Sequence, residues 1–210
     1  MGGKNKENKL ANKRGRRTAN VLMIAGAVLV LSALALFIYN RADSARAGRE
    51  SAELVEEIEE AWEETGEDTS GEDTSEAEEE ADTLIIDGYE CIGVLTIPAL
   101  ELELPVLAQF SYPNLKIAPC LYSGSLSDAD LVICAHNYDS HFGRLKYLSA
   151  GDEIYFTDAG GETSYFTVAS VSVYAPTAVE EIKESGYPLT LYTCTYGGKS
   201  RVTVMCEEAQ

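Results

Sequence analysis

An uninterrupted run of uncharged residues, 18–40, constrains this chain more than any other feature of its sequence. Its centre, Val21–Tyr39, is almost wholly apolar. As an α-helix the run would rise roughly 34 Å, which exceeds a bilayer core of about 30 Å. A soluble helix buried on every side is seldom so long, and the apolar core of a cleaved signal peptide is shorter. The run therefore predicts one N-terminal transmembrane helix that acts as an uncleaved signal anchor.

Charge is segregated on either side of this helix. Residues 1–17 form a basic tail, and 1–40 together carry a net charge of +6, whereas 41–83 carry −15 and 84–210 carry −10. Because basic residues favour the cytoplasmic side, we expect the N-terminus in the cytoplasm and the rest of the chain outside a cell membrane that it crosses once. The total of −19 excludes a general nucleic-acid binder, since a duplex repels such a surface.

The acidic segment 41–83 is predicted to be a stalk. Its first part has a helix-forming composition, and Leu54, Ile58 and Trp62 recur every four residues on one helical face. We favour a short helix that leaves the membrane over an appendage that docks on the catalytic face of the folded domain. The repeat GEDTSGEDTS at 66–75 and the acids after it hold too few apolar residues to form a core, which predicts a disordered spacer.

Residues 84–210 form the expected folded domain, whose length suffices for one core. Gly and Pro separate short runs rich in β-branched and aromatic residues, which is typical of an antiparallel barrel or sandwich. The predicted strands are 92–97, 102–107, 130–135, 153–157, 163–174, 189–195 and 201–206. Short helices are expected at 110–117, 142–149 and 178–185. The predicted fold class is therefore all-β, with minor helices.

Three side chains of this domain suggest nucleophilic catalysis. His136 follows an apolar strand, and Cys194 lies in another strand. The pair Gly197-Gly198 predicts a hairpin that returns Arg201 to the vicinity of Cys194. Together these groups can attack an acyl carbon, exchange protons and stabilise developing negative charge. On its own, a cysteine within a strand is more often a small buried apolar residue.

The remaining cysteines and the second histidine receive structural interpretations. Cys134 and Cys206 are expected to be buried on strands, and Cys91 and Cys120 lie near strand ends. A Cys91–Cys120 disulfide is an alternative outside the membrane. His141 is expected at the surface of a polar turn. The sequence has no CxxC pair, which disfavours a thiolate zinc site, and the scattered acids do not indicate calcium, so no cofactor is expected.

These residues carry a family resemblance. The segment TLYTC at 190–194 resembles the TLxTC signature of sortases, the membrane-anchored cysteine transpeptidases of Gram-positive bacteria. The order of His136, Cys194 and Arg201 is similar to the family's His–Cys–Arg order. The opening IGVLTIPALELELPVL at 92–107 resembles the first strands of a sortase domain.

The resemblance covers about residues 89–208 and implies a closed eight-stranded β-barrel, preceded by the transmembrane helix and the stalk. It implies that His136, Cys194 and Arg201 are catalytic and that the enzyme cleaves an LPxTG-like C-terminal sorting signal through a thioester on Cys194. The acyl group would pass to an amine of a peptidoglycan cross-bridge or of a pilin lysine. The implied partners are therefore surface proteins or pilins that carry sorting signals.

The resemblance also implies finer roles. Tyr192, Thr193 and Thr195 are expected to contact the substrate, and the backbone N–H of Thr195 is expected to be an oxyanion donor beside Arg201. The short segment before Thr190 fits a class D-like sortase better than a class B-like one, and no class C lid motif precedes the barrel. The class, the exact sorting motif and the amine nucleophile stay open.

Other functions are less consistent with the sequence. Papain-like hydrolases place the histidine after the cysteine, and L,D-transpeptidases carry a Ser-His-Gly-Cys type of motif that this chain lacks. A non-catalytic or purely hydrolytic extracellular barrel that binds peptides is the remaining alternative. The presence of His136, Cys194 and Arg201 together argues against that barrel being catalytically inert.

Overall fold

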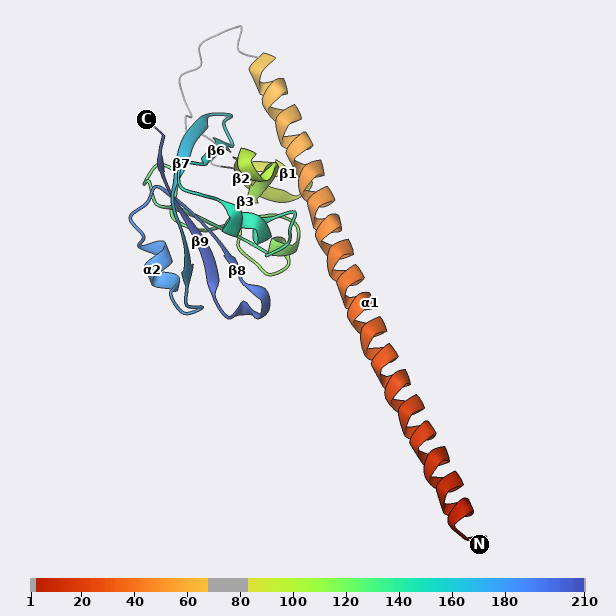
Figure 1. Cartoon of the computed structure of the whole chain (residues 1–210). Helices are drawn as coiled ribbons and strands as arrows, with labels where there is room; N and C mark the ends of the chain where they lie inside the picture. The colour runs from red at the N-terminus through yellow and green to blue at the C-terminus, as the bar shows by residue number, and fades with distance from the viewer. Residues whose placement is uncertain (1–2, 68–82, 210) are drawn as a thin grey trace, which may run out of the picture. The chain divides into compact units, whose positions relative to one another are not determined.

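The computed structural model describes residues 3–67 and 83–209 (Figure 1). Contacts divide the chain into two compact units, residues 1–43 and residues 44–210. The spacer predicted from the GEDTS repeat onward lies outside the described residues, apart from its first two residues, which end a helix.

The first unit is formed by the N-terminal part of helix α1, Gly3–Glu67. The side chains of residues 19–40 are exposed, and none of the residues in the most apolar stretch of the helix is buried. Among the described residues, this helix is the only one long and apolar enough to cross a membrane. An apolar helix without protein around it suits lipid surroundings, which suggests a single-pass membrane anchor.

The second unit is built on one curved sheet. Its strands, within the described residues, are β1 (Leu84–Ile86), β2 (Tyr89–Ile97), β3 (Leu102–Leu107), β4 (Cys120–Ser123), β5 (Leu131–Ala135), β6 (Glu153–Asp158), β7 (Thr163–Tyr174), β8 (Leu189–Cys194) and β9 (Arg201–Glu208). They pair in the order β1-β2-β3-β4-β5-β8-β9-β7-β6, and β2 also pairs with β6. This last pairing closes β2–β9 into an eight-stranded barrel, and β1 adds a hairpin at β2.

The barrel confirms the predicted all-β class and the closed eight-stranded architecture. Each of the seven predicted strands is present, and the predicted helical regions contain η2 (Asn114–Lys116), η3 (Phe142–Tyr147) and α2 (Val179–Lys183). Two further 3-10 turns are η1 (Pro98–Leu100) and η4 (Tyr196–Gly198). The expectation of purely antiparallel pairing was wrong, because β5 pairs parallel to β8, as β3 does to β4.

The barrel interior is filled by alternate side chains of the strands. From β5 and β8, for example, Ile133 and Leu191 point into a core that also contains Phe156 and Phe166. All four are almost completely buried. The period of two places the intervening residues on the outside of the barrel. In β5 and β8 the outer residues before Cys194 are buried as well, so both faces of these strands are covered up to that end.

Part of the outer face is covered by residues 44–64 of helix α1, which belong to the same compact unit as the barrel. Leu54, Val55 and Ile58 are buried in a second apolar cluster with Val94 of β2 and Leu107 of β3. Figure 1 shows this orange part of α1 beside β1 and β2. The helix therefore docks on the folded domain, and our preference for an undocked helix was wrong.

The docked helix is also held by polar contacts near its end. Trp62 Nε1 donates a hydrogen bond of 3.1 Å to the carbonyl of Ala159, in the turn between β6 and β7. The indole also lies over Gly161, where an added Cβ would come within 3.6 Å of the ring. The stripe of Leu54, Ile58 and Trp62 recognised in the sequence is thus the face that the helix buries on the barrel.

Candidate active site

The parallel pairing of β5 and β8 brings two of the predicted residues to one end of the barrel. Ala135 is the register partner of Thr193, and Thr193 Oγ1 donates a hydrogen bond of 2.8 Å to the carbonyl of Ala135. His136 directly follows Ala135, the last residue of β5, and Cys194 directly follows Thr193 as the last residue of β8. Both therefore follow the last paired rung at the same end of the sheet.

The hairpin between β8 and β9 adds the third residue. Cys194 is the register partner of Arg201, and the backbone N–H of Thr195 donates to the carbonyl of Ser200 at 2.9 Å. The turn is closed by Gly197 and Gly198, which have φ angles of 75° and 67°. L-residues with side chains rarely adopt such angles, so the Gly-Gly pair permits the tight return.

Arg201 contacts the thiol directly. Its Nη1 donates a hydrogen bond of 2.9 Å to Cys194 Sγ, and its guanidinium lies 5.7 Å from the centroid of the Tyr192 ring. The Nε of Arg201 is buried and has no hydrogen-bond partner among the described residues. The guanidinium therefore places a positive charge and a fork of N–H donors directly beside the sulfur. Its Nε–H can therefore donate a further hydrogen bond to a negatively charged oxygen.

Exposure separates Cys194 from the other four cysteines. Cys194 is exposed, whereas Cys91, Cys120, Cys134 and Cys206 are buried, and all five are free thiols. The alternative of a Cys91–Cys120 disulfide is therefore not realised. Burial raises the pKa of Cys91 to about 11 and the pKa values of Cys120, Cys134 and Cys206 to about 12. These four thiols are poor nucleophiles near neutral pH, since the thiolate is the reactive form.

The residues expected to contact substrate are placed differently from one another. Tyr192 packs edge-on against Tyr122 of β4, with ring centroids 5.3 Å apart, on the outer face of the barrel. Thr193 is only 3% exposed and uses its hydroxyl on Ala135, so it supports the strand pair instead of facing substrate. Thr195 is half-buried and bonds Ser200 through both its amide and its hydroxyl.

This arrangement corrects one predicted role. The backbone N–H of Thr195 was expected to be an oxyanion donor, but it donates to the Ser200 carbonyl within the hairpin. The tight turn imposed by Gly197 and Gly198 directs the amide inward, to the opposite strand. Arg201 thus remains the donor nearest to the sulfur among those that the sequence predicted.

His136 begins a compact loop between β5 and η3. Its ring is half-buried and stacks on Tyr138, with centroids 4.0 Å apart and an angle of 15° between the planes. Tyr138 also contacts the ring of His141 edge-on, at 5.5 Å. These contacts were not predictable from local composition, because a tyrosine in a polar loop is usually at the surface.

His141 is not the surface residue that we expected. It is 0% exposed, and its Nε2 lies 3.2 Å from the hydroxyl of Ser51 on helix α1. Burial lowers the pKa of His141 to about 4, and the nearby charge of His136 contributes in the same direction. His141 is therefore neutral at physiological pH. Its partner is distant in the sequence, which is why local composition misassigned it.

The depressed pKa of His141 predicts acid sensitivity. The unfolded histidine has a pKa of 6.5, so between pH 6.5 and about 4 the unfolded state binds more protons than the folded state. The stability of the folded state is therefore unaffected by this group above pH 6.5. As the pH falls through the window, the free energy of unfolding decreases by roughly 3 kcal/mol in total. We expect thermal unfolding scans to show a smaller decline of Tm across this window in His141→Gln than in the unsubstituted protein. Equal declines would contradict a buried neutral imidazole.

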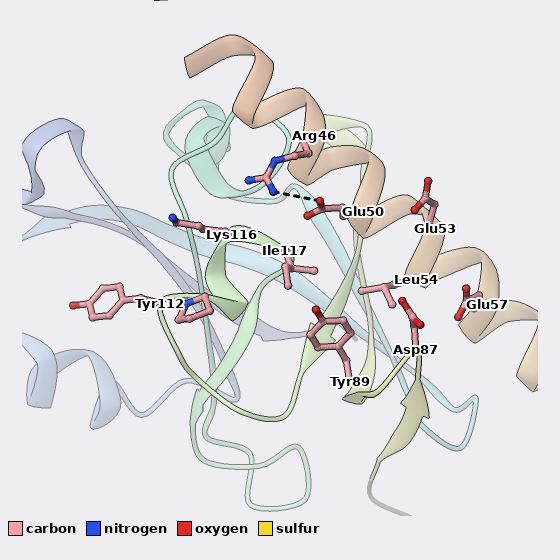
Figure 2. A pocket seen from close by; sticks show the side chains of 11 residues that line it. Arg46, Glu50, Glu53, Leu54, Glu57, Asp87, Tyr89, Tyr112, Lys116 and Ile117 are labelled. Carbon is pink, nitrogen blue, oxygen red and sulfur yellow. Dashed lines mark hydrogen bonds and ion pairs between the residues drawn. The ribbon is translucent and has the colours of Figure 1, made fainter. Parts of the chain in front are cut away.

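A second feature of the domain is a cavity of about 570 Å³ between helix α1 and the barrel, shown in Figure 2. Acids of the helix, the Arg46–Glu50 ion pair at 3.4 Å, and the rings of Tyr89 and Tyr112 line it. None of His136, Cys194 and Arg201 lines this cavity. Among the residues with described side chains, no group of three His, Cys, Asp or Glu is placed to hold a metal ion.

Comparisons with known proteins agree with the fold. The family model described as the sortase domain matches residues 95–209. Sortase A of Staphylococcus aureus (strain NCTC 8325 / PS 47) is 26% identical over 188 residues, which are 84% of this chain and 87% of that protein. Sortase A of Bacillus anthracis is 30% identical over 115 residues, which are 52% of this chain and 54%, or about half, of that protein's length.

Solved structures show the same fold. The Clostridium perfringens Sortase D5 transpeptidase has a TM-score of 0.53 and 17% identity, covering 77% of this chain and 97% of its own. The Clostridium perfringens sortase C with the C-terminal cell wall sorting motif has a TM-score of 0.51 and 19% identity, covering 81% and 89%. At these identities the two likenesses establish the architecture alone.

Proposed function

Because this chain belongs to the sortase family of cysteine transpeptidases, we propose that it cleaves an LPxTG-like sorting signal at Cys194 and transfers the acyl group to an amine. One observation carries the assignment to these atoms. The only exposed cysteine of the described residues accepts a hydrogen bond from Arg201 at the strand end that also carries His136. Nucleophile, proton carrier and cation thus lie at one end of the barrel.

The proposed reaction has two steps. The Cys194 thiolate attacks the Thr carbonyl of the signal, and the bond to the following Gly nitrogen breaks while His136 gives that nitrogen a proton. An amine then attacks the thioester, His136 takes the amine's proton, and the thiolate leaves. In each step the carbonyl oxygen carries transient negative charge, which Arg201 can stabilise through its remaining N–H groups.

The family and the position of the site support the proposed substrate class. A related sortase C has been solved with a cell wall sorting motif. In this chain, Cys194 is the exposed last residue of β8, where an extended peptide can reach the sulfur. The acceptor would be an amine of a peptidoglycan cross-bridge or a pilin lysine. We place the barrel outside the cell, anchored by residues 18–40, with the basic tail in the cytoplasm.

Selective labelling tests the assignment of the nucleophile. A peptidyl electrophile with an LPxT-like sequence and a thiol-reactive end group is expected to label the full-length protein at Cys194. Cys194→Ala should abolish labelling, and His136→Ala should slow it, because proton transfer assists the sulfur. Cys206→Ala is the matched control, since its thiol is buried, and it should label normally. Equal labelling of several cysteines would refute a specialised nucleophile and favour a barrel that only binds peptides.

The motif and the acceptor are found by a library screen. LPxTG-like pentapeptides are offered to the full-length protein in detergent micelles, with and without triglycine as a soluble amine. A transpeptidase forms the acyl-triglycine product in preference to the free acid. A purely hydrolytic enzyme would form only the acid, and that outcome would remove the transfer step from the proposal.

A further inference from the structure

The loop that follows His136 is held by its own backbone hydrogen bonds. The backbone amides of His141 and Gly143 both donate to the carbonyl of Tyr138, at 3.0 and 2.9 Å, and Phe142 donates to His136 at 3.3 Å. The ring of Tyr138 lies flat against the imidazole of His136. The position of the His136 ring therefore depends on the conformation of residues 137–143.

Helix α1 holds this loop from the outside. Ser140 Oγ donates a hydrogen bond of 2.7 Å to the carbonyl of Ser44. One turn later, a Cβ added to Gly48 would lie only 2.9 Å from the Cβ of Ser140, so the glycine allows the helix to approach the loop closely. Ser51 is one further turn along the same face and reaches His141. The three positions, spaced by four and three residues, form one stripe of the helix.

The contact between Ser51 and His141 is buried and directional. Ser51 is 1% exposed and His141 is 0% exposed. The Ser51 hydroxyl donates its proton to the carbonyl of Ile117 at 2.6 Å, so its oxygen can only accept from His141 Nε2 at 3.2 Å. This fixes the tautomer of the neutral imidazole. Without the hydroxyl both of these buried hydrogen bonds are lost, which weakens the hold of the helix on the loop.

We propose that Ser51 and His141 are positioning residues for His136, which they hold in place through the Tyr138 ring. The inference rests on the proposed role of His136 in proton transfer. Ring contacts connect the series: Ser51 bonds His141, His141 packs on Tyr138 at 5.5 Å, and Tyr138 stacks on His136 at 4.0 Å. Helix α1 thus helps to position the His136 ring in the active site.

The structure offers a matched control on the same helix. Trp62 anchors the helix to Ala159, in the turn between β6 and β7, and not to the loop of residues 137–143. Trp62→Phe removes this hydrogen bond and keeps an aromatic ring. If Ser51 acted only by holding the helix on the barrel, the two substitutions would have similar effects on catalysis.

The kinetic test uses the full-length protein in detergent micelles, the best pentapeptide of the library and triglycine. We expect Ser51→Ala to lower kcat about tenfold with KM changed less than twofold, because misplacement of a proton carrier slows the chemical steps and leaves peptide binding intact. Trp62→Phe is expected to leave both constants within twofold. The inference fails if Ser51→Ala retains the full kcat or if Trp62→Phe loses as much.

A second pair of variants distinguishes the loss of this hydrogen bond from misfolding of the domain. The amide nitrogen of glutamine can occupy the place of His141 Nε2 and donate to Ser51, whereas leucine cannot. His141→Gln is therefore expected to keep kcat within about threefold of the parent, and His141→Leu to resemble Ser51→Ala. Loss of activity in both would overturn the role assigned to this hydrogen bond.

A spectroscopic signature makes the test independent of turnover. The chain has two histidines, so the Cε1–H region of a proton–carbon spectrum contains two signals, one from each imidazole ring, which His141→Gln assigns. Ser51→Ala is expected to shift both signals, and Trp62→Phe neither. A shift confined to His141 would refute the inference even in an active enzyme. An inactive parent with both signals shifted in Ser51→Ala would instead refute the proposed function.

Discussion

Replacing Arg201 with lysine is expected to lower kcat/KM for peptide cleavage by about 100-fold while the protein stays folded. Arg201 uses Nη1 on the Cys194 sulfur, and its buried Nε has no partner among the described residues. The planar fork can therefore serve the sulfur and a substrate oxygen together. A lysine keeps the charge but concentrates its donors on one nitrogen, which cannot occupy both places.

The measurement is steady-state cleavage of a fluorogenic version of the library's best pentapeptide. Unfolding free energy is followed in parallel and is expected to change by less than about 1 kcal/mol, since Arg201 is not in the apolar core. Lys199→Ala is the control, because Lys199 is the other basic residue of the hairpin and is exposed. Cleavage at a near-normal rate by Arg201→Lys would remove Arg201 from the oxyanion role.

Truncating Ile58 to alanine is expected to destabilise the barrel unit by about 2–5 kcal/mol. Ile58 is 0% exposed and belongs to the apolar cluster that joins helix α1 to β2 and β3. Its removal opens a cavity on the outer face of the barrel, where Val94 and Leu107 lose a packing partner. A stalk that merely left the membrane would tolerate this change without cost.

The chain provides its own probe for this experiment. Trp62 is the only tryptophan and lies at the docked end of the helix, so its fluorescence reports docking directly. Denaturant unfolding of Ile58→Ala is compared with that of Glu56→Ala, an exposed neighbour that should behave as the parent. If Ile58→Ala unfolds at the denaturant concentration of the parent, the docked helix does not contribute to the folded domain.

Much of the fold and of the site could be predicted because the signals are local. Strands such as β7 and β9 alternate apolar and polar residues, and the Gly197-Gly198 turn fixes the partner of Cys194. Two strands escaped prediction: β1 and β4, of three and four residues, are too short to show a period. Their pairing comes from the neighbouring strands and not from their own sequences.

What failed were inferences about contacts between distant segments. The outer residues of β2 and β3, including Val94 and Leu107, lie in apolar runs, so the sequence did not distinguish a helix-covered face from the interior. His141 was assigned to the surface because its partner, Ser51, is separated from it by the spacer and most of the barrel's first half. The amide of Thr195 was misassigned because it already donates to the Ser200 carbonyl within the hairpin.

The proposed transpeptidase reaction depends on an acyl enzyme at Cys194. Intact-mass spectrometry of the full-length protein, incubated with the best pentapeptide in the absence of an amine, tests it most directly. We expect an added mass equal to the acyl fragment that ends at Thr, located on Cys194 and removed by triglycine with release of the transfer product. Transfer product formed by Cys194→Ala, or an adduct on any other residue, would contradict it.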